Sequence, residues 1–105
     1  MSKKNGESQR SAPRHWKPGS RGDSISGTLI GVERVRVYGK KVRAAILEAE
    51  DGEQWSVLLG YAVLKAKWEQ MNPGRGQIVT ITVTGFGESK KRGVEYLQFD
   101  LHVED

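Results

Sequence analysis

The feature of the sequence that most constrains its fold is one change of hydrophobic period, from two to 3.6 residues and back. Apolar and polar residues alternate on both sides of a short central segment, as they do in half-buried strands. The apolar residues of that central segment follow the i, i+3, i+7, i+10 spacing of one helix face: Tyr61, Leu64, Trp68 and Met71. We therefore predict a single short helix, ended by Asn72-Pro73-Gly74, within an all-β chain.

Five segments carry the strand pattern. Three precede the predicted helix, over residues 25–37, 41–49 and 53–59, and two follow it, over residues 77–85 and 94–103. Gly27 and Gly31 interrupt the long first segment, and we expect this strand to bend there. Asp51-Gly52 predicts a hairpin between the second and third strands. The predicted order is therefore β-β-β-α-β-β.

Charge divides the chain into two parts. Residues 1–22 hold six Lys and Arg and one acid, a net +5, whereas residues 23–105 hold eleven basic and twelve acidic residues, a net −1. The first part is polar, with Trp16 as its one large apolar group, and such a segment buries too little surface to offset its ordering entropy. We predict a disordered basic arm over 1–22 and one folded domain over 23–105. Trp16 could extend a contact with nucleic acid or hold the arm against the domain.

Enzymatic signatures are missing from the sequence. It has no cysteine, and its two histidines are too far apart for metal-ligand spacing. The carboxylates around Asp51 are typical of a solvated hairpin tip, and neither nucleotide-binding fingerprint occurs. We predict a protein that is not an enzyme and uses no cofactor or metal. The longest apolar run, residues 57–64, is too short to cross a bilayer, so we expect no membrane contact. The lack of cysteine favours an intracellular location.

Several motifs carry a resemblance to a known family: Trp16-Lys17-Pro18-Gly19, Ile25-Ser26-Gly27-Thr28-Leu29, Asp51-Gly52, the helix 61–71 and the segment 73–79. With the order of elements, they resemble the OB-fold single-stranded DNA-binding proteins, particularly small ones encoded by phages and mobile elements. The resemblance implies a five-stranded Greek-key barrel with a helix between strands three and four. It also implies binding of single-stranded DNA with little sequence preference, in replication, repair or recombination, in the cytoplasm of a bacterial or phage-infected cell. A homo-oligomer is possible.

Two basic clusters are the candidate nucleic-acid contacts. The first is the densest in the chain and includes an aromatic ring: Arg34, Arg36, Tyr38, Lys40, Lys41 and Arg43. Alternation predicts that Arg34, Arg36 and Tyr38 leave one face of their strand. Cations follow the phosphates of a single strand, and rings stack on its bases. The second cluster is Lys90, Lys91 and Arg92, on a loop that in OB-folds flanks the binding face together with the first hairpin.

Three further aromatic residues complete the predicted interface. Tyr96 is expected on the outer face of the last strand, and Phe86 could stack on a base or cap the barrel. Trp55 shares a face with core residues, but a bulge after Gly52 would turn it outward as a stacking platform. Two alternatives to DNA binding stay open at this point: an RNA-binding module, and an OB-fold subunit used for protein interaction or assembly.

Overall fold

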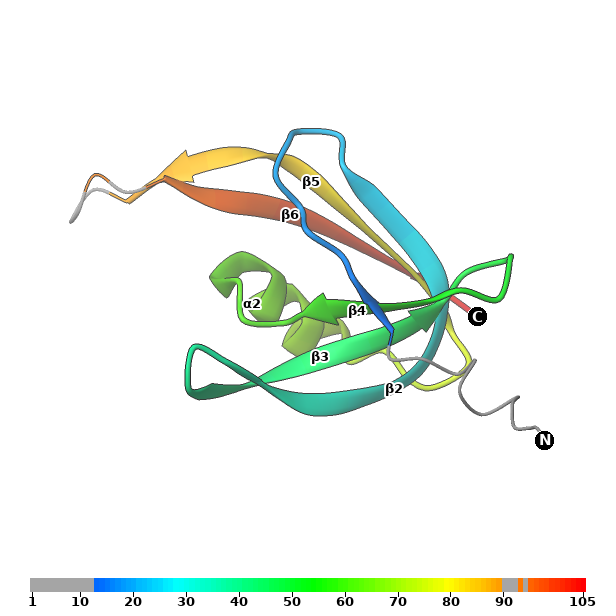
Figure 1. Ribbon diagram of the computed structural model, residues 1–105. Helices are drawn as coiled ribbons and strands as arrows, with labels where there is room; N and C mark the ends of the chain where they lie inside the picture. The colour runs from blue at the N-terminus through cyan, green and yellow to red at the C-terminus, as the bar shows by residue number, and fades with distance from the viewer. Residues whose placement is uncertain (1–12, 90–92, 94) are drawn as a thin grey trace.

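The computed structural model describes residues 13–89, 93 and 95–105 of the 105-residue chain. Its strands are β1 (Arg14–His15), β2 (Ser24–Val37), β3 (Lys40–Glu48), β4 (Gln54–Leu58), β5 (Ile78–Glu88) and β6 (Glu95–Glu104), and its helix is α2 (Ala62–Met71) (Figure 1). The described chain is thus mostly β with one short helix, as the change of period predicts. No helix within these residues is long and apolar enough to cross a membrane.

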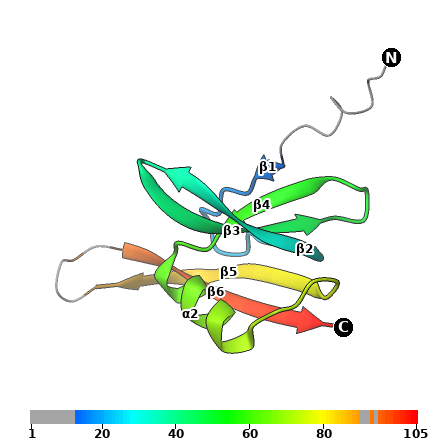
Figure 2. The same cartoon turned by 90° about the horizontal axis from the view of Figure 1, so that it is seen from below.

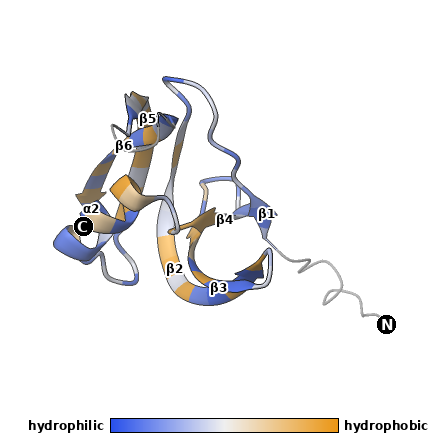
Figure 3. Cartoon of the chain, turned by 90° about the vertical axis from the view of Figure 1, so that its left-hand side faces the viewer, coloured by the Kyte–Doolittle hydropathy of each residue, from blue (hydrophilic) through white to orange (hydrophobic). Residues whose placement is uncertain are grey.

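The strands form one curled sheet in the order β1-β4-β3-β2-β5-β6. Every pair is antiparallel except β1 with β4. The long strand β2 belongs to both halves of the sheet, because it pairs with β5 over its first residues and with β3 from Thr28 onward. Figure 3 shows how β2 and β3 curve round, so that the sheet forms a half-barrel. The prediction of five strands is wrong by one, since β1 is a sixth.

Both predicted glycines lie where β2 changes partner. A Cβ atom on Gly27 would stand 2.8 Å from the backbone oxygen of Glu48, so the close approach of β3 leaves room only for a hydrogen. The pairing of β2 with β3 then shifts register between Leu29 and Gly31, which marks a bulge. Close approach and bulge together let one strand serve both halves of the sheet.

The core fills the concave side of the sheet. Alternate residues of the strands point into it, as in Ile25 and Leu29 of β2 and Val79, Ile81 and Val83 of β5. Helix α2 packs against β6 and adds Leu64 and Trp68 to this core (Figure 2). The predicted stripe is correct at its centre, whereas Tyr61 precedes the helix and Met71 is half exposed at its last residue.

Residues 13–23, which we call the N-terminal strap, pack on the sheet. Arg14 and His15 pair with β4, and the Trp16 amide donates to the Ser56 carbonyl at 3.0 Å. The Trp16 ring lies against the core, with its centroid 6.5 Å from that of Phe99 on β6. Of the two alternatives for Trp16, the structure therefore favours the one in which it holds this segment against the domain. Residues 1–12 of the arm lie outside the described residues.

The far end of the strap is fixed by backbone and carboxylate contacts. The Gly22 amide donates to the Val83 carbonyl at 2.8 Å, which ties the strap to β5. One Asp23 carboxylate oxygen accepts the Gly19 and Ser20 amides, each at 2.9 Å. These two hydrogen bonds favour the charged form and lower the pKa of Asp23 below its ordinary value. The strap thus runs from the edge of β4 to β5.

Candidate nucleic-acid interface

The hairpin of β2 and β3 ends in a two-residue turn, Tyr38-Gly39. Both residues have positive φ, 49° and 80°, as a type I′ turn requires. A tyrosine is an unusual residue in this left-handed region, which disfavours most side chains with a Cβ. The Tyr38 side chain is nevertheless fully exposed, with 100% of its surface in contact with solvent. The turn therefore presents an aromatic ring that contributes no packing to the fold.

Four cations face one another directly behind this turn. Arg34 stands opposite Arg43, and Arg36 stands opposite Lys41, so each cross-strand pair brings two like charges together. We call these four residues the cation ladder. Like charges in opposed positions destabilise a sheet. A local arrangement that works against folding is typical of functional sites.

The register also decides which side of the hairpin the cation ladder occupies. Along β3, Leu47 and Ala45 are buried in the core, and alternation places Arg43 and Lys41 on that same side. The ladder therefore continues the concave side beyond the core. Lys40 pairs with Val37 and leaves the opposite side. The expectation that Tyr38 shares a face with Arg34 and Arg36 is wrong in detail, because the turn begins at Tyr38.

A hollow of about 420 Å³ adjoins the cation ladder, and we call it the basic hollow. Its lining comes from β2, β3, the connection after β4 and helix α2: Arg34, Lys41, Val42, Arg43, Leu59, Gly60 and Lys65. Four of these seven residues are cations. Among the described residues, the only carboxylate paired with any of them is Glu69, whose Oε2 lies 3.4 Å from the Arg43 guanidinium. Both side chains of that pair are about half exposed, so it holds Arg43 weakly.

Lys65 was not among the predicted site residues. It lies in the first turns of α2, where the sequence pattern places it on a polar side of the helix. Nothing in that pattern distinguishes it from Lys67, which does not line the hollow. Only the tertiary structure distinguishes Lys65 from Lys67, because the lining of the hollow depends on where α2 lies.

The second predicted cluster, Lys90, Lys91 and Arg92, lies outside the described residues. The strand ends on either side of it are defined, because Glu88 pairs with Glu95 and the Gly93 amide donates to the Ser89 carbonyl at 2.7 Å. Figure 1 shows the described ends of the β5–β6 hairpin projecting on the same side of the molecule as the β2–β3 turn.

Phe86 and Tyr96 leave opposite faces of the β5–β6 hairpin. Phe86 pairs with Leu97, on the core side, and is half exposed. Tyr96 pairs with Gly87, on the outer side as predicted, and a Cβ on Gly87 would meet the Tyr96 hydroxyl at 2.6 Å. The Tyr96 ring therefore lies flat across the glycine. These two rings do not form a common stacking platform, because a bulge at Gly85 sets Phe86 opposite Leu97.

Trp55 belongs to the core side of β4. It pairs with Leu47, and the β3–β4 register runs without the bulge that would turn it outward. The ring is half-buried against the core, and the Arg14 guanidinium lies 5.9 Å from its centroid. Arg14 is held there by Glu53 at 3.0 Å. Of the two alternatives for Trp55, the structure favours packing, and its partner Leu47 lies four positions along β3 from Arg43 of the cation ladder.

The opposite end of β3 carries the reverse charge. A hollow of about 650 Å³ at this end is lined in part by Glu48, Glu50 and Asp51. The described residues contain no group of three or more metal-ligating side chains close enough to hold an ion. The surface charge is therefore negative at this end of β3 and positive at the other. A polyanion is repelled from the first end and attracted to the second.

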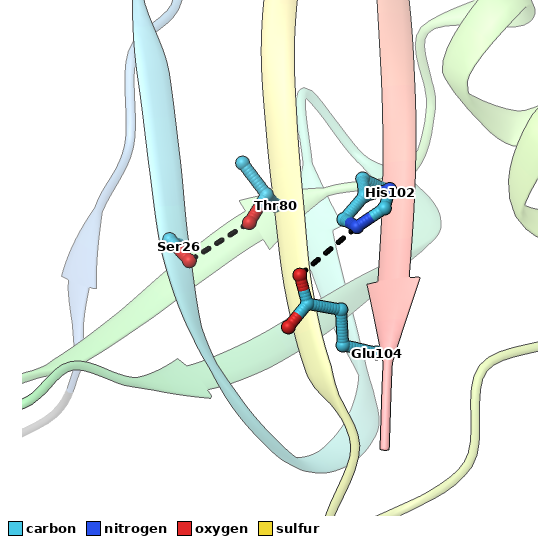
Figure 4. Close-up of polar contacts among 4 residues, drawn as sticks. All are labelled: Ser26, Thr80, His102 and Glu104. Atoms are coloured by element: carbon cyan, nitrogen blue, oxygen red, sulfur yellow. Dashed lines mark hydrogen bonds and ion pairs between the residues drawn. The ribbon is translucent and has the colours of Figure 1, made fainter.

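The outer face of β2, β5 and β6 is polar. Hydroxyl groups bond to one another across the strands, as the Ser26 Oγ and Thr80 Oγ1 do at 2.9 Å, and the His102 imidazole bonds Glu104 at 3.0 Å (Figure 4). The outward position of His102 agrees with the alternation. Among the described residues, no hydrogen bond joins the Ser26–Thr80 pair to the His102 imidazole.

Comparison with known proteins gives no relative for this chain. It matches no protein-family model, and searches among curated proteins and among solved structures find no match.

Proposed function

We propose that the protein binds single-stranded nucleic acid, DNA in the first instance, along the concave side of the β2–β3 hairpin. The observation that carries this proposal is the cation ladder, in which Arg34 opposes Arg43 and Arg36 opposes Lys41. Mutual repulsion of these charges is relieved when a polyanion lies between them. Phosphates of a nucleic-acid strand supply such a polyanion, and their neutralisation releases counterions.

Tyr38 supplies the second kind of contact. Its fully exposed ring stands at the turn, next to the Arg36 end of the cation ladder. A base can stack on such a ring whatever its identity, which gives affinity with little sequence preference. Phosphate contacts at the ladder and a stacked base at the turn together describe a non-enzymatic strand-binding surface.

We further propose that the domain is an OB-fold. The support is its strand pairing: β2 pairs with both β3 and β5, β5 pairs with β6, and α2 connects β4 to β5. This connectivity matches a partly open Greek-key barrel. Strands β4 and β6 do not pair with each other; β1 pairs with β4, and Trp16, which follows β1, packs its ring near Phe99 of β6. In OB-folds, oligonucleotides bind beside the hairpin that corresponds to β2–β3.

The direct test is fluorescence anisotropy with labelled dT and rU oligomers at two salt concentrations. We expect dT binding that weakens steeply with salt, because phosphate contacts dominate. Equal or tighter rU binding would assign the site to RNA. No binding to either oligomer would overturn the proposal and leave a protein-interaction module as the better account.

A further inference from the structure

We propose that the basic hollow binds one phosphate of the nucleic-acid backbone, and that Glu69 occupies Arg43 in its place when no strand is bound. This inference rests on the proposed function and assigns a defined subsite within it. It adds Lys65 to the binding residues and makes Glu69 an internal competitor of the ligand.

The lining of the hollow indicates the chemistry of its ligand. Cations reach it from three elements: Arg34 from β2, Lys41 and Arg43 from β3, and Lys65 from α2. The other lining residues are Val42, Leu59 and Gly60, so no aromatic ring is available for a base to stack on. A compact anion suits this lining better than a base does. The volume of about 420 Å³ leaves room for the sugar attached to a phosphate as well.

The position of Glu69 explains why it competes. Lys65 and Glu69 are four residues apart on α2, so they share one face of the helix, and that face borders the hollow. The Glu69 carboxylate lies 3.4 Å from Arg43, the longest of the three ion pairs among the described residues. Its side chain is 57% exposed, so water can solvate it once it is displaced.

Displacement of Glu69 has a cost that the strand must offset. An exposed ion pair contributes little, so its removal should tighten binding by about two- to fivefold at low salt. With Glu69 present, the carboxylate released from Arg43 recruits a cation, which cancels part of the counterion release. Without it, the slope of log K against log[salt] should steepen by about 0.7.

Two matched pairs of variants test the inference in dT anisotropy titrations. Glu69→Gln should tighten binding and steepen the salt slope, whereas Glu33→Gln, the same charge change on the opposite side of β2, should alter both less. Lys65→Gln should weaken binding and flatten the slope by about 0.7, whereas Lys67→Gln, two positions along α2 and therefore on another side of the helix, should have the smaller effect.

The outcomes separate this inference from the proposed function. If the wild-type protein binds no oligomer, the proposed function fails and the subsite fails with it. If the wild type binds but Glu69→Gln matches Glu33→Gln and Lys65→Gln matches Lys67→Gln, the subsite alone is overturned. Thermal unfolding of all four variants confirms that each is folded.

Discussion

Arg34 and Arg43 stand directly opposite each other on neighbouring strands, on the side of the hairpin that continues the core. Their charges repel, and the only carboxylate that forms an ion pair with either of them among the described residues is Glu69, which contacts Arg43. The two positive charges therefore favour binding of a polyanion but destabilise the free hairpin. The first prediction follows from that opposition.

Arg34→Gln should leave the free energy of unfolding unchanged or raise it by up to about 1 kcal/mol, because it removes a like-charge pair. The same change should weaken dT binding and flatten the salt slope by about 0.7. Thermal unfolding and anisotropy measure the two effects. Arg75→Gln is the control, since Arg75 lies in the exposed turn before β5, away from the hollow. A clear loss of stability in Arg34→Gln would make the residue structural.

Tyr38→Asn should separate stacking from charge. Asparagine tolerates the left-handed conformation of this turn better than tyrosine, so stability should stay the same or rise. Loss of one stacked base, about 1–3 kcal/mol, should weaken dT binding by roughly five- to 150-fold. The salt slope should not change, because no counterion is involved. Unaltered affinity would remove Tyr38 from the interface.

Gly27→Ala and Gly31→Ala test the bend of β2. The added methyl at Gly27 meets the backbone oxygen of Glu48, so overpacking should cost about 1–3 kcal/mol of unfolding free energy. At Gly31 no atom lies within 4 Å of the added carbon, and the change should be neutral or stabilise by up to about 1 kcal/mol. Denaturant titration of both variants gives the comparison. Equal effects would contradict the close approach at Gly27.

Trp16→Ala tests whether the N-terminal strap belongs to the fold. The half-buried ring packs on Phe99, so its loss should cost about 2–3 kcal/mol, somewhat less than the ~3–5 kcal/mol of a fully buried aromatic residue. Denaturant unfolding measures this cost. Trp16→Phe, which keeps an aromatic ring at the site, should recover part of the loss. An unfolding free energy equal to the wild type would return residues 13–22 to the arm.

The sequence predicts the strand-and-helix order because alternation and helix spacing are local properties. Gly27 and the Asp51-Gly52 turn are found where the pattern puts a bend and a hairpin, since both requirements are carried by the backbone of a few residues. Local pattern left two alternatives open for Trp16, and only the distant contact of its ring with the core decides between them.

The candidate site was only partly predictable for the same reason. Alternation along β2 predicts that Arg34 and Arg36 share a face. The pairing of β2 with β3 shows that Lys41 and Arg43, also in the predicted cluster, lie opposite them on that face. Lys65 lies beside the same hollow because of how α2 packs in the fold, and the local sequence pattern does not predict that packing. Phe86 and Tyr96 diverge because of a bulge at Gly85, and a single inserted residue of that kind reverses every later side chain of a strand.

Asp23 gives the strap a dependence on pH. Two backbone hydrogen bonds lower its pKa in the folded state, so its stabilising contribution is present above the unfolded-state value of about 3.9 and is lost as pH falls through the folded-state value. Asp23→Ala should therefore have a lower Tm than the wild type at pH 7, and the difference should shrink towards pH 3. A difference in Tm that is constant across this range would contradict the role of the charged carboxylate.

The most direct test of nucleic-acid binding is the salt dependence of the affinity for a labelled dT oligomer, measured by anisotropy on the full chain. If about five phosphates are neutralised, log K against log[salt] should fall with a slope near −3.5. The slope should become shallower when Arg34 and Arg43 are both replaced by Gln. An affinity that does not vary with salt, or no affinity at all, would contradict the assignment of the cation ladder to phosphate binding.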